Sequence, residues 1–359
     1  MKFDLVPANT GKMLISKDKN TFKQIDAHKT TTGRFFTVKS SWLTAPVYEF
    51  IAHALSHAPR VLDPFAGDGH LLDKCAAVFN CKINGLDIHH VKWAVNDSLL
   101  AIPAAADQMI VTNPPYLAKY SASRKGVGAA VAGYFADTDD EDLYQIALRR
   151  CLSAARFVVA IIPETFLNSK FPKHALVAVS VLENNPFTDT DVPVCVACFD
   201  TQQCDGVTAA RIYKADIFCA TLGDIHRQRL PAARDARIQF NVADGQVALR
   251  AVDSTDPAIR IAFVLAADFH YARDKIKVSS RLLTYIALQN VPPEALPDLI
   301  TRANLALETL RTTSHDLILS PFKGNNKAGV RRRRLDYALA RGLLLGAMVA
   351  PSSCLAPLP

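Results

Sequence analysis

The residues best suited to chemistry in this sequence are Asn113, Pro114, Pro115 and Tyr116. They follow the apolar run "QMIVT", residues 108–112, which predicts a buried strand. Proline fixes one backbone angle and lacks an amide hydrogen, so two in succession stiffen the chain as it leaves the strand. An amide side chain, a rigid backbone carbonyl and an aromatic ring in this order indicate a site that holds one chemical group in a fixed geometry.

A second candidate is the stretch "DPFAGDGH", residues 63–70, between a predicted strand and a predicted helix. Gly67 and Gly69 can adopt positive φ or let backbone amides approach a ligand closely. No Gly-Lys-Ser or Gly-Lys-Thr follows, which disfavours a phosphate-binding loop of the ATPase kind.

Two carboxylates follow this loop at informative distances. Asp87 ends the predicted strand "INGLDI" about twenty residues after the loop, where an acidic side chain can accept hydrogen bonds from two ribose hydroxyls. Asp97, in "VNDSLL", could receive the exocyclic amine of an adenine. Each carboxylate alone is more often a surface residue or a helix cap. Together with the glycine loop, they predict a nucleoside pocket.

The elements that must position these residues alternate between strand and helix from 45 to 215. The apolar patterns predict strands at 60–65, 82–88, 108–112, 156–162 and 192–199, and helices at 47–55, 71–79, 141–154 and 173–184. Such alternation predicts an α/β fold, with a doubly wound, mostly parallel sheet covered by helices on both faces. The loops after the strands then share one edge, where ligands bind.

Residues 117–140 form a long segment after the Asn-Pro-Pro-Tyr tetrapeptide with no predicted element of their own. A structureless loop of this length is uncommon in a compact domain, so we expect a mobile flap beside the site.

Beyond residue 215 the pattern changes to short strands and helices. Strands are predicted within 237–252 and 259–266, and helical periods occur at 281–289 and 294–312. We therefore expect a domain boundary near 205–225 and an appended α+β region after it.

The composition is that of a globular protein, with 359 residues of which half are apolar. No signal peptide or membrane span is apparent, so we expect a cytoplasmic protein. Cys195, Cys198 and Cys204 suggest zinc, but "VPVCVACFD" is typical of a buried strand and no second ligand pair follows, so no metal is expected.

The net charge of +7 is unevenly placed. Residues 323–341 hold seven Lys or Arg against one Asp, and four of these are the consecutive residues Arg331, Arg332, Arg333 and Arg334. Such a run is usually a solvated face or a loose tail, but it is also what a surface that binds a polyanion requires.

Taken together, these motifs resemble the class I, S-adenosylmethionine-dependent methyltransferases, specifically the adenine-N6 DNA methyltransferases of restriction-modification systems. "DPFAGDG" resembles their cofactor loop, "NPPY" their catalytic tetrapeptide, and 32–55 the segment that closes over the methionine end of the cofactor. The order of these segments is that of the gamma group. The resemblance covers roughly residues 30–200.

The resemblance implies a seven-stranded methyltransferase sheet and three regions: an N-terminal arm at 1–31, a catalytic domain at 32–210 and a target-recognition region at 211–359. It implies a set of cofactor contacts, which are Thr37, Asp63, Phe65, Gly67, Gly69, Asp87, Ile88, Asp97 and Asn113. It also implies double-stranded DNA as substrate. If the run Arg331–Arg334 lies along the duplex, these arginines would contact its phosphates, and a solvated tail is the alternative. A monomer is expected, with any cognate restriction endonuclease acting on the same site without a stable complex.

The same resemblance gives the tetrapeptide a role. An adenine amine is a poor nucleophile because its lone pair is delocalised into the ring. Asn113 and the carbonyl of Pro114 can accept both N6 hydrogens, and the stiffness of the prolines fixes where that carbonyl points. Tyr116 would stack on the flipped-out base. The resemblance suggests Phe187 as the second aromatic. Phe199 is the alternative, but it lies inside a predicted strand, where an aromatic is more typical of the core.

Three other methyl acceptors share this chemistry: adenine of ribosomal RNA, glutamine of proteins and N4 of cytosine. The glutamine enzymes resemble chains with a helical N-terminal domain and little after the sheet, whereas here a long region follows the sheet. Cytosine enzymes more often carry Ser in place of Asn113.

Overall fold

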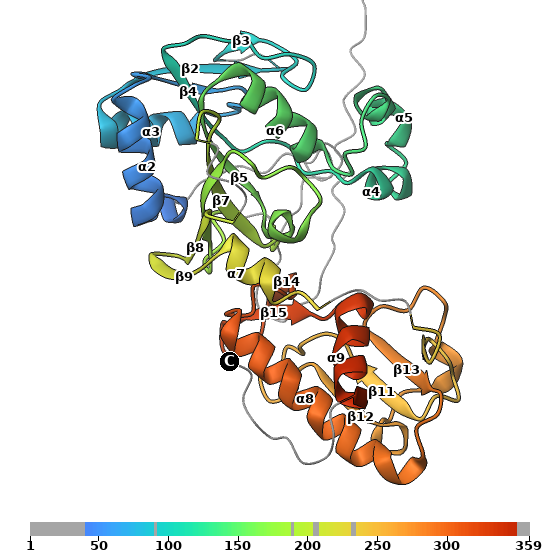
Figure 1. Cartoon of the computed structure of the whole chain (residues 1–359). Coiled ribbons are helices and arrows are strands. Elements are labelled where there is room, and N and C mark those ends of the chain that lie inside the picture. The colour runs from blue at the N-terminus through green and yellow to red at the C-terminus, as the bar shows by residue number, and fades with distance from the viewer. Residues whose placement is uncertain (1–39, 90–91, 188–189, 204–207, 231–234, 350–359) are drawn as a thin grey trace, which may run out of the picture. The chain divides into compact units, whose positions relative to one another are not determined.

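The computed structural model describes residues 40–89, 92–187, 190–203, 208–230 and 235–349. They divide into two compact units, the first ending at Pro163 and resuming over Phe171–Cys204, and the second comprising Glu164–Lys170 and the chain from Asp205. Figure 1 labels the helices and strands of both. The predicted α/β organisation with a mostly parallel sheet is present in the first unit.

The first unit alternates strands and helices along the chain. Its elements are η1 (Ser40–Trp42), α2 (Ala45–Leu55), β1 (Arg60–Asp63), α3 (His70–Phe79), β2 (Lys82–Asp87), β3 (Ala94–Val95), β4 (Gln108–Thr112), α4 (Lys119–Arg124), α5 (Gly128–Val131), η2 (Ala132–Phe135), α6 (Leu143–Ala154), β5 (Phe157–Pro163), β6 (Leu176–Val181) and β7 (Val194–Asp200). The predicted strands at β1, β2, β4, β5 and β7 and the predicted helices at α2, α3 and α6 are confirmed.

These strands lie in the order β3-β2-β1-β4-β5-β7-β6. The pairs from β3 to β5 are parallel, and β7 runs antiparallel to both β5 and β6. Every residue of β4, β5 and β7 is buried, as expected of strands covered on both faces. Chain order reverses between β1 and β4, which makes the edge beyond these two strands the topological switch point.

Two segments of the first unit differ from the sequence prediction. The helix expected at 173–184 is instead the strand β6, because Val177, Val179 and Val181 alternate at the strand period and are β-branched. The segment expected to be structureless at 117–140 forms α4, α5 and η2. It lies against a cluster of buried residues that includes Leu99 and Leu143, so the prediction of a structureless loop is wrong.

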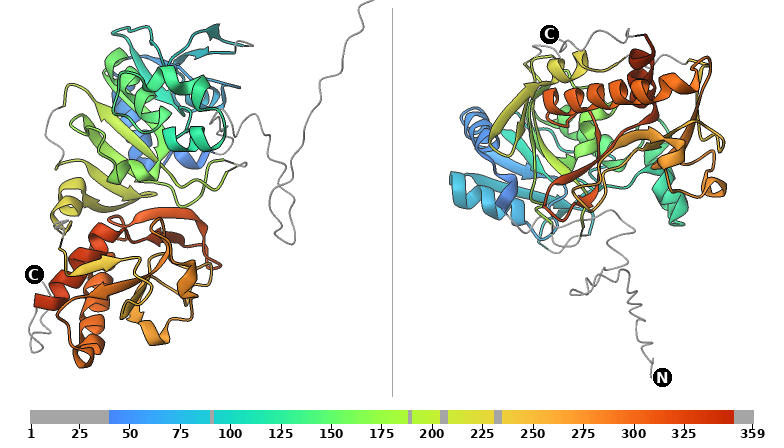
Figure 2. Two further views of the ribbon diagram at one scale, coloured as in Figure 1. Left: turned by 90° about the vertical axis from the view of Figure 1, so that its right-hand side faces the viewer. Right: turned by 90° about the horizontal axis from the view of Figure 1, so that it is seen from below.

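The second unit is α+β, and Figure 2 shows it from two further directions. Its elements are η3 (Glu164–Asn168), β8 (Arg211–Lys214), β9 (Ile217–Thr221), α7 (Leu222–Arg227), β10 (Ile238–Phe240), β11 (Val247–Arg250), β12 (Ala262–Leu265), η4 (Ala266–Asp268), η5 (Arg273–Lys275), β13 (Leu283–Leu288), η6 (Pro293–Ala295), α8 (Leu296–Thr313), β14 (Ser320–Asn325), β15 (Arg331–Arg334) and α9 (Tyr337–Val349).

Within this unit, β10, β13, β11 and β12 form an antiparallel sheet, while β8 with β9 and β14 with β15 are hairpins. The strands predicted within 237–252 and 259–266 and the helix predicted at 294–312 are confirmed. The helix predicted from the period at 281–289 is wrong. That stretch is the strand β13, whose Thr284, Tyr285 and Ile286 favour a strand.

Candidate functional site

The residues singled out from the sequence gather at the carboxyl ends of β1, β2 and β4. β1 pairs in parallel with both β2 and β4, so their ends lie along one edge of the sheet. The glycine loop leaves β1, Asp87 ends β2, and the Asn-Pro-Pro-Tyr tetrapeptide leaves β4. This edge includes the switch point between β1 and β4, the usual ligand position in such sheets.

The glycine loop has the backbone conformations expected of it. Gly67 has a φ of 50° and Gly69, the N-cap of α3, has a φ of 89°. A Cβ atom added to Gly69 would lie 2.6 Å from Trp93 Cζ2, so a side chain there would both strain the backbone and clash. Trp93 Nε1 also donates a hydrogen bond to the carbonyl of Gly67 at 2.9 Å. Sequence reasoning missed Trp93, because nothing in its local pattern ties it to a loop about two dozen residues earlier.

Asp87 is connected directly to the glycine loop. Its Oδ2 accepts a hydrogen bond from the amide of Gly67 at 3.1 Å, and its Oδ1 accepts one from the amide of His89 at 2.7 Å. Asp87 therefore fixes the loop, and its carboxylate oxygens are acceptors of the kind that hydroxyl groups donate to. Ile88, the next residue, is exposed at the same strand end.

Asp97 contacts the segment that the sequence left without structure. Its Oδ1 accepts a hydrogen bond from the amide of Leu99 at 3.1 Å, and its Oδ2 accepts one from the hydroxyl of Tyr134 at 2.7 Å. Burial and this hydrogen bond raise the pKa of Tyr134 to about 12. Tyr134, from η2, thus contacts the carboxylate expected to bind the adenine amine. No sequence pattern indicated this contact.

Asp63 and Phe65, predicted as cofactor contacts, are both turned partly inward. The Asp63 side chain is buried, and its Oδ1 accepts hydrogen bonds from the Thr112 hydroxyl at 2.6 Å and the Phe65 amide at 3.0 Å. Burial raises the pKa of Asp63 to about 7, although both hydrogen bonds lower it. Phe65 packs against the cluster around Leu117. Asp63 therefore joins the ends of β1 and β4.

The Asn-Pro-Pro-Tyr tetrapeptide is held by its own tyrosine. The single hydrogen of the Tyr116 hydroxyl is shared between two acceptors, Asn113 Oδ1 and the carbonyl of Ile161 in β5, the latter at 2.6 Å. Pro114 is buried and Pro115 half-buried. The Tyr116 side chain is only 8% exposed, and burial raises its pKa well above 10. This arrangement places the Asn113 amide oxygen at a defined position just beyond β4.

Phe187, the second aromatic named above, lies beside Tyr116. The two rings are 6.2 Å apart, measured between centroids, with an interplanar angle of 63°. Phe187 is buried. The Tyr144 ring, in α6, also contacts the Tyr116 ring, with 6.5 Å between the two ring centroids. Phe199, the alternative, is a fully buried residue of β7. Since the Tyr116 ring is covered in this conformation, stacking on a base requires the ring to become accessible.

Thr37 and the N-terminal arm lie outside the described residues. Cys195 and Cys198 are buried in β7. Within the described ranges there is no group of His, Cys, Asp or Glu arranged to hold a metal ion, and no helix long and apolar enough to cross a membrane.

The four arginines form the strand β15, so their side chains alternate between two faces. Arg331 and Arg333 both approach Glu164 of η3, Arg331 at 3.9 Å, and Arg333 is 2% exposed. The Arg332 guanidinium lies over the Phe322 ring at 4.8 Å. Arg333 therefore does not fit the predicted DNA-facing surface, because its guanidinium is buried in an ion pair.

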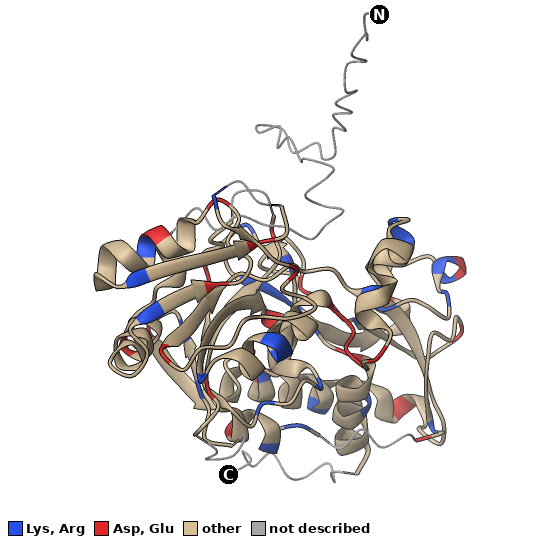
Figure 3. Cartoon of the chain, turned by 90° about the horizontal axis from the view of Figure 1, so that it is seen from above, with Lys and Arg blue, Asp and Glu red and all other residues tan. Residues whose placement is uncertain are grey.

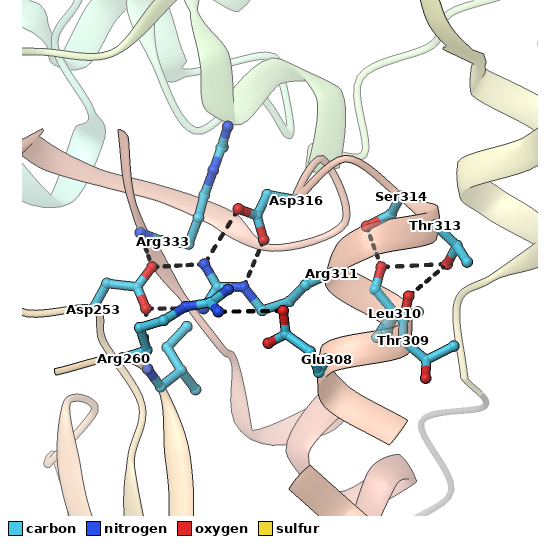
Figure 4. Close-up of polar contacts among 11 residues, drawn as sticks. Asp253, Arg260, Glu308, Thr309, Leu310, Arg311, Thr313, Ser314, Asp316 and Arg333 are labelled. Atoms are coloured by element: carbon cyan, nitrogen blue, oxygen red, sulfur yellow. Dashed lines mark hydrogen bonds and ion pairs between the residues drawn. The ribbon is translucent and has the colours of Figure 1, made fainter. Parts of the chain in front are cut away.

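A buried network supports this strand (Figure 4). Arg311 of α8 donates hydrogen bonds to both oxygens of Asp253, at 2.9 and 3.0 Å, and its Nε donates to Asp316 at 2.7 Å. Asp253 also accepts from the backbone amide of Arg333 at 3.0 Å. Burial raises the pKa of Asp253, but the hydrogen bonds from Arg311, Ile261 and Arg333, together with the Arg311 charge, outweigh it and hold that pKa below its usual range. The arginine strand is thus part of the packed interior of its unit.

No protein-family model and no curated protein matches the chain. Among solved structures, it is similar to the methyltransferase subunit of a type I restriction-modification system from Streptococcus thermophilus. The identity is 15% and the TM-score 0.33, over 47% of this chain and 45% of that one. It is also similar to the M protein of the type I restriction enzyme EcoKI, with 14% identity and a TM-score of 0.30, over 76% of this chain and 71% of that one.

The chain thus spans less than half of the length of the Streptococcus subunit. TM-scores of this size do not establish a shared fold, so the function is inferred below from the residues of this chain.

Proposed function

We propose that the chain is an S-adenosylmethionine-dependent DNA methyltransferase that modifies the N6 amino group of adenine. The observation that carries the proposal is the meeting of two loops at the switch point. The glycine loop with Asp87 lies beyond β1 and β2, and the sequence Asn-Pro-Pro-Tyr follows directly from β4. A nucleoside-binding loop beside a rigid amide is the pairing that amine methylation requires.

The residues around the glycine loop fit the cofactor. The positive φ of Gly67 and Gly69 sets the turn of this loop, and Trp93 packs against Gly69 and holds the loop in place. Asp87 would accept the ribose hydroxyls, Asp97 the adenine amine, and Ile88 would cover the base. S-adenosylmethionine, when bound, supplies an electrophilic methyl group.

The acceptor site activates an amine by holding its hydrogens. Asn113 Oδ1 and the carbonyl of Pro114 would accept the two N6 hydrogens, which concentrates the nitrogen lone pair towards the methyl group. The Tyr116 hydroxyl fixes the Asn113 side chain, and Pro114 and Pro115 fix the backbone. No base with a shifted pKa is needed before attack.

The substrate in this proposal is double-stranded DNA with the target adenine flipped out of the helix. A base inside a duplex cannot reach the methyl group, so it must be extruded. Tyr116 and Phe187 are the aromatic residues beside the amide and would hold the extruded base by stacking. The Tyr116 ring must then exchange some of its present contacts for the base.

We place the enzyme in the gamma group and in a restriction-modification system, acting as a monomer. The seven strands from β3 to β6 would be its methyltransferase sheet and the region from 211 its target-recognition region. A cognate endonuclease would act on the same DNA site without a stable complex. Within β15, the residues that remain candidates for DNA contact are Arg331, Arg332 and Arg334.

The test is to map modified bases in the genomic DNA of cells that express the protein. N6-methyladenine at one sequence motif, absent from cells that express Asn113→Ala, supports the proposal. N4-methylcytosine at a motif would move the target to cytosine. Methylated ribosomal RNA or methylated glutamine, with unmodified DNA, would replace DNA as the substrate.

A further inference from the structure

The second unit contains an open cavity of about 450 Å³ that none of the residues discussed above except Arg334 belongs to. It is lined by Asn241 after β10, Val278 and Arg281 before β13, Arg334 at the end of β15, and Asp336 and Tyr337 at the start of α9. Its size lies within the range of small-molecule and nucleotide sites.

The residues around Tyr337 in this cavity are held in fixed positions. Tyr337 stacks on Phe240 with ring centroids 4.4 Å apart and an interplanar angle of 13°. The single hydrogen of the Tyr337 hydroxyl is shared between the carbonyl of Ser280 at 2.9 Å and Asn241 Oδ1 at 3.2 Å. Asn241 has a φ of 64°, a left-handed conformation that asparagine tolerates well.

The loop that contributes Val278 and Arg281 to the cavity, residues 275–281, is held in place by side-chain hydrogen bonds. Asn241 Nδ2 donates to the carbonyls of Val278 and Ser280, at 2.9 and 3.3 Å. Arg281 Nη1 donates to the same two carbonyls, at 3.1 and 2.8 Å. The loop backbone is therefore fixed before any ligand arrives, which reduces the entropy lost on binding.

The charge around the cavity is predominantly positive. Arg281 and Arg334 line it, and the loop adds Lys275 and Lys277, both exposed. In the part of the chain that the structure describes, no ion pair joins any of these four to a carboxylate. The acidic residue of the cavity, Asp336, uses one oxygen to accept the Leu339 amide at 2.8 Å at the start of α9.

Figure 3 shows that Lys and Arg recur on many elements, so charge alone selects no surface. What distinguishes this cavity is a fixed basic loop beside a recess lined by two arginines, Arg281 and Arg334. Arg260 offers the contrast, because in the same unit its charge is offset by Glu308 at 3.2 Å.

We propose that this cavity and its loop bind the phosphodiester backbone of duplex DNA, with one phosphate at Arg281 and Arg334 and the next along the strand at Lys275 and Lys277. The inference rests on the proposed function for the identity of the polymer. A chain of phosphates is favoured over a single one because the positive charge continues along the loop beyond the cavity.

The test measures the affinity of the full chain for a fluorescein-labelled duplex over a series of potassium chloride concentrations. Each phosphate contact that is lost lowers the slope of log affinity against log salt by about one. The combined variant Lys275→Gln, Lys277→Gln and Arg334→Gln removes the contact at one phosphate and one of the two cations at the other. It is expected to lower the slope by between about one and about two and to weaken unrelated duplexes equally. Arg260→Gln, the matched control, is expected to keep the wild-type slope.

A second variant separates charge from loop geometry. Asn241→Ala keeps every cation but removes the bonds to the carbonyls of Val278 and Ser280, so the affinity should fall while the slope stays near that of the wild type. A combined variant with the wild-type slope would overturn the inference, as would equal weakening by Arg260→Gln.

Methylation of the same duplex by the wild-type protein, measured in parallel, separates the two proposals. If the wild type binds and methylates DNA but the combined variant keeps its salt slope, only the cavity assignment fails. If the wild type neither binds nor methylates duplex DNA and binds single-stranded RNA through the same cations, the substrate class fails as well.

Discussion

Asp63 is a buried carboxyl group whose pKa is raised to about 7 by burial. This pKa lies above 3.8, the ordinary pKa of an aspartate, so the folded protein binds the proton more tightly than the unfolded chain does. Stability should therefore fall as pH rises from about 4 to about 7 and level off above, with a loss of up to about 4 kcal/mol.

Asp63→Asn removes this titration, because an amide stays neutral and its oxygen can still accept from Thr112 and Phe65. Urea unfolding at pH 5 and at pH 8 checks this by tryptophan fluorescence, since the two tryptophans of the chain, Trp42 and Trp93, both lie in the first unit. An equal pH dependence in the variant and the wild type would contradict the role of Asp63.

Asp87 is expected to act on cofactor affinity. Asp87→Ala removes both the proposed ribose contacts and the acceptor of the Gly67 amide, so binding of S-adenosylmethionine should weaken by roughly 1–3 kcal/mol in calorimetry. Asp73→Ala is the matched control, because Asp73 is an exposed carboxylate of α3 paired with Lys92 at 3.4 Å. Unchanged affinity in Asp87→Ala would remove this residue from the pocket.

At the scale of elements, η3 and β15 are joined by the ion pair of Glu164 and Arg333, both of which are almost completely buried. Arg333→Gln leaves the Glu164 charge buried without its principal partner, which should destabilise the second unit by about 3–5 kcal/mol. Circular dichroism during urea unfolding measures this, while the fluorescence of the first unit should hardly change.

Arg334→Gln serves as the comparison for that variant. Arg334 is the neighbour in the same strand, is half-buried, and forms no ion pair with a described carboxylate. Its replacement should change the stability of the unit by less than about 1 kcal/mol. Equal destabilisation by both variants would show that the strand, and not the ion pair, carries the effect.

The sequence predicted elements best where apolar periodicity was strong. β4, β5 and β7 are continuous apolar runs. The acidic residues before α6 indicated a helix start, and α6 does begin at a capping box formed by Asp142 and Gln145. β6 and β13 were predicted as helices, because short apolar runs fit both periods until strand pairing decides between them.

The candidate site was predictable from the sequence to the extent that its residues follow strands directly. Gly67, Gly69, Asp87 and Asn113 lie at strand ends, and parallel pairing brings those ends together. Tyr134 and Trp93 were missed because their contacts, to Asp97 and to the glycine loop, depend on how a connecting segment packs. The burial of Arg333 was equally hidden, since its partner Glu164 is far away in the sequence.

In the molecule as a whole, binding and chemistry are proposed for different residues. Asp87 and the glycine loop would hold the cofactor, the basic loop of the second unit would hold DNA, and Asn113 would act on the amine alone. These roles predict that one substitution can stop methyl transfer and leave both binding steps in place.

The most direct test is the transfer of a labelled methyl group from S-adenosylmethionine to duplex DNA by the wild type and by Asn113→Ala, with the labelled base identified after digestion. The account predicts N6-methyladenine from the wild type, none from the variant, and similar cofactor and DNA affinities for both. Near-wild-type transfer by Asn113→Ala, or a labelled product other than N6-methyladenine, would contradict it.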